Sequence, residues 1–188
     1  MHRSVLVVVA LAVSLVLAGC SPGGVDESPG SPLPSASVPA PPSSVNAEMD
    51  ALYAEAESVF RRVMELRFQF ELQPQQYEFP AEMGELLADP YLSWVRGGYD
   101  YMREQNWHAP DGVEPTFVVA RYPGASKADS EVALEGCLDT RQVPALDASG
   151  QVVSEGTVFH LELFFKHFDG QLKLFEGTSN EVTECAIR

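Results

Sequence analysis

The sequence predicts an α+β fold, in which N-terminal helices pack on a curved antiparallel sheet of about four strands. Between residues 49 and 70, apolar residues recur every three or four positions, which is the spacing of an amphipathic helix. From residue 116 onward the spacing changes to every second position, as in half-buried strands. An Asp169-Gly170 pair between two such stretches is a strong signal for a tight hairpin. This order of helices and then strands favours one sheet whose apolar side is covered by the helices.

The composition limits which partners the chain binds. Its 188 residues carry a formal net charge of −15, from 12 basic and 27 acidic side chains. Such a surface repels phosphate backbones and anionic lipid headgroups, so nucleic acid is not an expected partner. Solubility is one interpretation of the acidity, and attraction of a cationic ligand or partner is the other.

The first residues have the layout of a secretory signal. A basic Met1-His2-Arg3 start precedes an apolar run from Ser4 to Ala18, shorter than the roughly 20 residues of a spanning helix. The run ends in Leu17-Ala18-Gly19-Cys20, which resembles the lipobox of bacterial lipoproteins. The resemblance implies that residues 1–19 are a signal peptide and that a lipid on Cys20 holds the mature protein at the outer face of the cell membrane. A soluble secreted protein and an uncleaved anchor helix are the alternatives.

Residues 20–45 are predicted to form a tether. Proline, serine, glycine and alanine dominate from Ser21 to Ser44, without an apolar period. Such a segment cannot bury enough surface to offset the entropy of ordering it. At about 3.1 Å per residue its upper reach is roughly 75 Å. The globular domain is then residues 46–188, and O-glycosylation of the tether is a further hypothesis.

A long helix is expected to begin near Asn46, a suitable N-cap, and to end before Pro74. Its apolar face consists of Met49, Leu52, Ala56, Val59, Val63, Leu66 and Phe70. Tyr53, Phe60 and Met64 widen this face, which favours packing on a sheet over a dimeric coiled coil.

Two more helices are indicated, a short one over residues 81–88 and a longer one over residues 90–106. Asp89-Pro90 resembles an N-cap followed by proline at the first helical position. The Gly97-Gly98 pair predicts either a break in the longer helix or a close contact with another helix.

Strands are expected over residues 116–122, 131–139, 157–167, 171–176 and 181–186. Alternation places Val132, Leu134, Gly136 and Leu138 on one face, and likewise Phe159, Leu161, Leu163 and Phe165. A two-residue turn at Asp169-Gly170 would pair Phe165 with Leu174 on one face. It would pair Phe164 with Phe175 on the other. Because the same register sets two lysines opposite each other, a bulged turn is the alternative.

Cys137 and Cys185 are the two cysteines that remain after Cys20. Thiols outside the cytoplasm oxidise, so one intrachain disulfide is the expected state. Free thiols, a metal-binding pair and redox chemistry are the alternatives, although the pair lacks the close spacing of a redox site.

Three short motifs carry a family resemblance: Gly136-Cys137-Leu138-Asp139 in a strand, the linker Asp147-Ala148-Ser149-Gly150, and residues 169–174 of the last hairpin. With the helices before them, they resemble the nuclear transport factor 2-like domains of lipoproteins from high-GC Gram-positive bacteria. The resemblance implies a cystatin-like cone, in which a bent sheet wraps around helices. That superfamily includes isomerases, dehydratases and polyketide cyclases, and also many non-catalytic binding or scaffold domains.

No catalytic residue, metal site or cofactor is predicted. Enzymes of the family hold an Asp/His or Tyr/Asp set inside the cone, whereas the inward face expected here carries no carboxylate. Asp139 would have to turn into the cone to act as a general base, and alternation places it with Cys137 on the opposite face. His160 and Glu162 share a strand face but form only half of a metal site.

A ligand cavity, if the cone is open, would be lined by Tyr91, Trp94, Tyr99, Trp107, Phe159, Leu161 and Leu163. Core packing of the same side chains is the alternative. The expected function is a non-catalytic binding or scaffold role in the cell envelope, with an envelope protein as partner. A binder of small apolar molecules is the second hypothesis, and an isomerase- or cyclase-type enzyme is the third.

Overall fold

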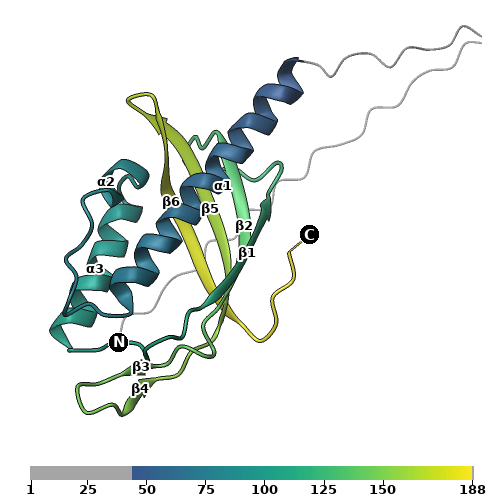
Figure 1. Ribbon diagram of the computed structural model, residues 1–188. Helices are drawn as coiled ribbons and strands as arrows, with labels where there is room; N and C mark the ends of the chain where they lie inside the picture. The colour runs from purple at the N-terminus through teal and green to yellow at the C-terminus, as the bar shows by residue number, and fades with distance from the viewer. Residues whose placement is uncertain (1–43, 188) are drawn as a thin grey trace, which may run out of the picture. The chain divides into compact units, whose positions relative to one another are not determined.

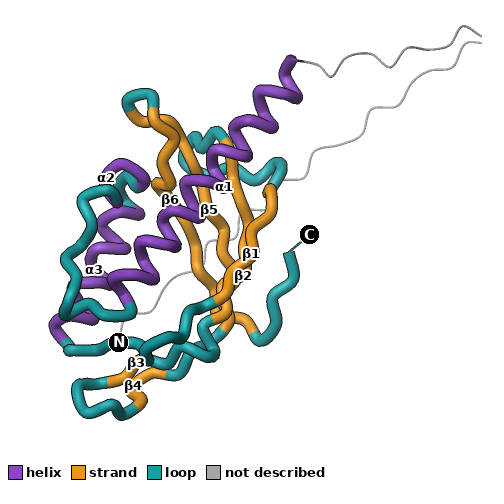
Figure 2. Tube along the Cα trace, viewed as in Figure 1, coloured by secondary structure: helices purple, strands orange, loops and turns teal. Residues whose placement is uncertain are grey.

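The computed structural model describes residues 44–187, with side chains from residue 46 onward. Within this range the predicted α+β fold is confirmed, with the helices packed on a four-stranded antiparallel sheet (Figures 1 and 2). The predicted signal peptide, Cys20 and residues 21–43 of the predicted tether lie outside the described residues. None of the helices in residues 44–187 has the length and apolar run that a membrane crossing requires.

Helix α1 spans Ser44–Glu71 and runs diagonally across one face of the sheet (Figure 1). It contacts strands β2 and β6, which fits packing on a sheet. The predicted apolar face is buried from Tyr53 to Phe70, including Phe60 and Met64, whereas Met49 near the start of the helix is exposed. The helix ends before Pro74, as predicted.

The two shorter helices follow on the same side of the sheet (Figure 1). Helix α2 spans Met83–Leu86 and helix α3 spans Tyr91–Glu104. The Asp89 carboxylate accepts hydrogen bonds from the backbone N–H and the hydroxyl of Ser93, at 3.1 and 2.6 Å, and so caps the first turn of α3. The prediction for Gly97-Gly98 is wrong: α3 continues through the pair, and a Cβ on either glycine would meet open space.

The main sheet has the strand order β1-β2-β5-β6. Its strands are β1 (Thr116–Arg121), β2 (Val132–Asp139), β5 (Val158–Phe168) and β6 (Gln171–Val182). Two short strands that the sequence did not indicate, β3 (Ala145–Leu146) and β4 (Val152–Ser154), form a separate hairpin between β2 and β5. The separate last strand over residues 181–186 is wrong, because β6 runs without interruption to Val182.

The β5–β6 hairpin has the predicted turn. Asp169 and Gly170 both have positive φ, 52° and 80°, as a two-residue type I′ turn requires. Phe165 lies opposite Leu174, as predicted, but the pairing of Phe164 with Phe175 is wrong. The register shifts at this point, and Phe164 lies opposite Glu176 instead. Phe175 is therefore the extra residue of a β-bulge.

The bulge changes which β6 residues face the helices. Leu172 and Leu174, before the bulge, belong to the core. Beyond it, Gly177, Ser179 and Glu181 lie opposite Leu163, Leu161 and Phe159, which face the helices. These three positions therefore share the concave face.

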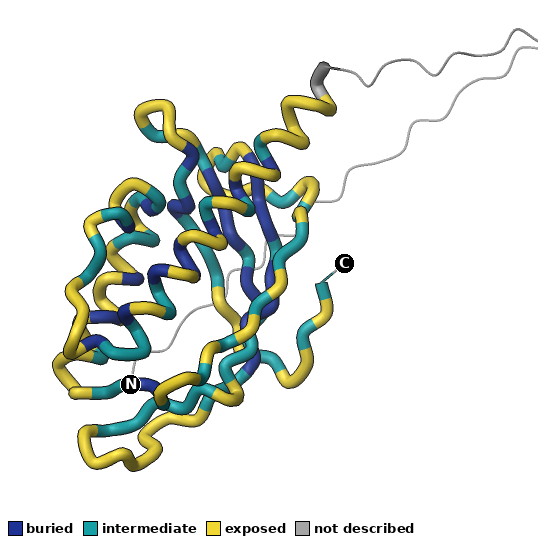
Figure 3. Tube along the Cα trace, viewed as in Figure 1, coloured by how far each residue is buried: buried dark blue, intermediate teal, exposed yellow. Residues whose placement is uncertain are grey.

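The core lies between α1, α3 and the concave face of the sheet (Figure 3). Phe60, Phe165 and Leu174 are almost fully buried in it. A smaller apolar cluster on the opposite, convex face contains Ala133, Phe164 and Phe175. Residues 46–187 thus share one main core, and the far side of the sheet is only partly covered.

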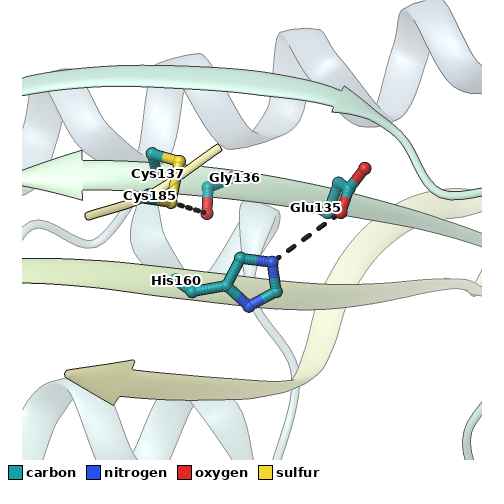
Figure 4. The surroundings of a disulfide bond; sticks show 5 residues. All are labelled: Glu135, Gly136, Cys137, His160 and Cys185. Atoms are coloured by element: carbon teal, nitrogen blue, oxygen red, sulfur yellow. Dashed lines mark hydrogen bonds and ion pairs between the residues drawn. A yellow bond between two sulfur atoms is a disulfide. The ribbon is translucent and has the colours of Figure 1, made fainter. Parts of the chain in front are cut away.

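The predicted disulfide joins Cys137 of β2 to Cys185 of the C-terminal segment (Figure 4). The segment after β6 is not a strand, and the Cys185 sulfur lies 3.8 Å from the Gly136 carbonyl oxygen. The bond therefore fixes an irregular segment to the convex face of the sheet. A disulfide is typical of a domain that folds outside the cytoplasm.

Candidate functional site

The predicted cavity residues separate into two groups. Tyr99, Leu161 and Leu163 are buried in the core, and Trp107 packs edge-on against Tyr101. Tyr91, Trp94 and Phe159 instead line hollows that open to the surface. The space between the helices and the middle of the sheet is therefore filled, and these hollows lie beside α1 and α3 at its margins.

A groove lies between α3 and the edge strand β6, and we call it the α3–β6 groove. It encloses about 320 Å³ and is lined by Pro90, Tyr91, Trp94, Glu176, Gly177, Thr178 and Ser179. Trp94 is 57% exposed, which is unusual for so large an apolar side chain. Its ring lies 5.4 Å from the ring of Tyr91, so the two aromatic residues form one continuous wall.

Gly177 allows this wall to approach the strand. A Cβ at this position would lie 2.8 Å from the Tyr91 ring and 3.2 Å from the Glu162 carbonyl oxygen. Any larger residue would force the ring away from the sheet. The glycine therefore sets the width of the groove at its floor.

The opposite wall is a sheet edge. In the described part of the chain, the outer edge of β6 pairs with another segment only at Leu174, whose carbonyl accepts a hydrogen bond from Ala88 N–H at 3.0 Å. Strand residues direct their backbone groups alternately to the two sides. The Thr157 carbonyl accepts a hydrogen bond from Thr140 N–H on the β2 side, so by alternation Leu161 and Leu163 bond to β2 and Glu162 bonds to β6. Its partner Thr178 therefore directs its backbone groups to β5, and Gly177, Ser179 and Glu181 direct theirs away from β5. Two of these three residues line the groove.

A partly buried ion pair lies next to the groove. Arg67 donates two hydrogen bonds to the Glu71 carboxylate, at 2.7 and 3.3 Å, and the two side chains are only 18% and 23% exposed. Burial works against the charge of Arg67, but the Glu71 carboxylate outweighs it and keeps the guanidinium pKa above its ordinary value. Burial raises the pKa of the nearby Tyr91 phenol, because it disfavours the charged phenolate. Tyr91 is therefore a neutral hydrogen-bonding group at physiological pH.

Arg67 and Glu71 are expected to stabilise the fold only when both side chains are present. Glu71→Leu should lower the free energy of unfolding by about 2 kcal/mol, because it leaves a partly buried guanidinium without its acceptor. Arg67→Met combined with Glu71→Leu should recover much of that loss. Chemical denaturation of the four members of this double-mutant cycle measures the effect. Glu57→Leu, which breaks the exposed pair Glu57–Arg61 on the same helix, is the control and should change stability by less than about 0.5 kcal/mol.

A second hollow, which we call the cone mouth, opens at the C-terminal end of α1. It encloses about 270 Å³. Its apolar lining includes Met64, Phe68, Met102, Leu138 and Phe159. Arg67 and Glu71 line both the cone mouth and a third hollow over Gly97 and Gly98. The ion pair thus lies where the two hollows meet, and the cone mouth has further polar side chains in His108, Thr140, Ser154, Glu155 and Thr157.

The residues considered for chemistry lie elsewhere. Asp139 forms an ion pair with Arg141 at 2.5 Å, and hydrogen bonds from Arg141 hold the pKa of its carboxyl below the ordinary value. On the convex face, Glu162 accepts a hydrogen bond from Thr178 at 3.0 Å, and His160 lies 3.7 Å from Glu135 (Figure 4). Among residues 46–187, no three His, Cys, Asp or Glu side chains are placed to share a metal ion.

Sequence reasoning missed the ion pair and the open edge for different reasons. Arg67 and Glu71 are four residues apart, so their contact on a helix was readable from the spacing. The open edge depends on the bulge at Phe175 and on the path of the chain after Ala88. The alternation of β6 gave no signal for either.

Neither a protein-family model nor a curated protein matches the sequence. Among solved structures, the chain is similar to the intermembrane space region of the chloroplast protein ARC6. The superposition has a TM-score of 0.48 and 14% sequence identity, and covers 71% of this chain and 98% of that one.

Proposed function

We propose that this protein is a non-catalytic binding domain of the cell envelope, whose α3–β6 groove takes a segment of a partner protein. The observation that carries the proposal is Trp94, which stands exposed beside an unpaired stretch of sheet edge. Exposed aromatic side chains are enriched where proteins bind one another. Unpaired strand edges readily accept another chain.

We further propose that a lipid on Cys20 holds the domain at the outer face of the membrane. The support is the sequence Leu17-Ala18-Gly19-Cys20 after an apolar run, together with the disulfide, which fits an oxidising compartment. Cys20→Ser should move the protein out of the membrane-bound, lipid-modified pool. Mass spectrometry of the N-terminal peptide and membrane fractionation measure this, and an unchanged, uncut Cys20→Ser protein in the membrane would disprove the anchor.

Partner binding at the groove can be tested by photo-crosslinking in the intact cell. A photoreactive phenylalanine analogue at position 94 should crosslink to a discrete partner. The matched control places the same analogue at Tyr101, an equally exposed aromatic residue of α3 that does not line the groove. Crosslinking at both positions, or at neither, would contradict a partner site in this groove.

The cone mouth supports a second candidate function, the binding of a small apolar molecule. Its lining combines apolar side chains with the ion pair Arg67–Glu71 and a few other polar groups such as His108, a combination typical of ligand pockets. Native mass spectrometry of the oxidised protein from its own host should then detect an adduct that is lost on denaturation. Phe159→Trp, which fills the hollow, should abolish the adduct, whereas Trp94→Ala should leave it unchanged.

A further inference from the structure

We infer that the partner segment binds the α3–β6 groove as an added strand, an extended basic peptide that pairs with β6 along Gly177–Glu181. The inference rests on the proposed partner binding at this groove. It adds the conformation of the bound segment, the backbone atoms that hold it, and the charge that selects it.

The chain itself already extends the sheet at this edge. Leu87 forms a parallel bridge with Leu174, and Ala88 N–H donates to the Leu174 carbonyl. At Asp89-Pro90 the chain turns away from the edge and enters α3. Leu87 and Ala88 therefore occupy the position of a fifth strand beside Leu174. Beyond Leu174 no described residue occupies that position, and an incoming segment would continue the strand that these two residues begin.

The vacated edge presents a regular set of backbone groups. The N–H and C=O groups of Gly177, Ser179 and Glu181 point to the open side of β6. In the described residues none of these groups forms a backbone hydrogen bond with an element other than β6 itself. The edge thus offers up to six backbone groups to a peptide, which is the basis of recognition by strand addition.

The groove walls predict the side chains of the added strand. On the concave side, an added strand would face Tyr91 and Trp94, which favour apolar side chains. On the convex side it would extend a cross-strand row formed by Glu135, Glu162 and Thr178. The Glu162 carboxylate, which Thr178 contacts next to the edge, would stabilise a lysine or arginine at the next position of the row. The expected segment therefore alternates apolar and basic residues.

A second copy of the same chain does not fit this edge as well. Pairing two β6 strands would bring together two glutamate-bearing edges of chains that each carry a formal charge of −15. Repulsion between like charges disfavours that arrangement. The same charge attracts a basic segment and accelerates its association.

The test uses an eight-residue peptide of alternating valine and lysine, labelled for fluorescence anisotropy, with the full-length protein in detergent. It should bind, and a valine–glutamate peptide of the same length should bind at least about tenfold more weakly. The backbone amides of either the valines or the lysines face β6, and N-methylation of that set should abolish binding. Methylation of the other set should be tolerated. If the valine amides are the sensitive set, the added strand is antiparallel, and if the lysine amides are, it is parallel.

A pair of protein variants gives the reciprocal test. Ser179→Pro removes one outward N–H without breaking a bond to β5, and should weaken binding by about tenfold or more. Ser179→Ala keeps that N–H and should bind as the unaltered protein does. Failure of the valine–lysine peptide to bind, tolerance of both methylation patterns, or equal binding by the two variants would overturn strand addition. Crosslinking at position 94 tests the proposed function independently of strand addition. A partner that crosslinks there equally well in both Ser179 variants would use the groove without adding a strand.

Discussion

Replacing Cys137 and Cys185 together with serine is expected to lower the free energy of unfolding by about 4 kcal/mol. The disulfide closes a loop across a sequence separation of 48 residues, and a closed loop of that length restricts the unfolded chain strongly. In the folded state the bond is also what fixes the C-terminal segment to β2, because that segment forms no strand. Chemical denaturation of the oxidised protein and of the double variant gives the difference directly.

Reduction provides the matching control for this prediction. A reducing agent should lower the stability of the unaltered protein to that of the double serine variant and leave the variant itself unchanged. The double variant is preferred to either single one, because a single substitution leaves a reactive thiol that pairs between molecules. Equal stability of the oxidised protein and the double variant would show that the bond contributes nothing to the fold.

Phe165→Ala is expected to lower the free energy of unfolding by about 4 kcal/mol. Phe165 is fully buried in the core, so truncation loses its burial and leaves a cavity that the surrounding sheet and helix cannot close. Thermal or chemical unfolding measures the loss, and an unfolded product at room temperature would agree with it.

Phe159→Ala is the matched control, because it removes the same side chain from the same strand and the same face. Phe159 lines the cone mouth and is only partly buried, so the cost should be about 2 kcal/mol. Equal losses at the two positions would contradict the division of the concave face into a filled core and an open mouth. The pair of variants therefore tests where packing ends and accessible surface begins.

The architecture was predictable because periodicity reports which side of an element is buried. The spacing of Val63, Leu66 and Phe70 predicted one helical face, and the alternation from Phe159 to Phe165 predicted one strand face. Asp169-Gly170 predicted the turn because few other pairs accept two consecutive residues with positive φ. Each of these signals is local, and each was confirmed.

The errors arose where the outcome depends on contacts distant in sequence. Met49 matches the helical spacing but lies exposed near the start of α1. A bulge such as that at Phe175 is fixed by the pairing partner, and alternation within one strand cannot reveal it. The candidate site had the same difficulty: Tyr99 and Trp94 are both aromatic residues of α3, yet one is buried and the other stands in a groove. Tyr99 packs against Phe70 and Phe79, whereas Trp94 lies beside the edge of β6, and both sets of contacts are distant in sequence.

The bulge at Phe175 also predicts how related chains should differ in length. Because it adds one residue between Leu174 and Gly177, a homologue with a regular strand would lack one residue there and would align with a single-position gap. In such a homologue the residues beyond the gap would lie on the same faces of the sheet as they do here, although each would be numbered one lower. A single-residue deletion at the bulge is therefore compatible with an unchanged concave face, whereas a deletion elsewhere in β6 would exchange the two faces of the residues beyond it.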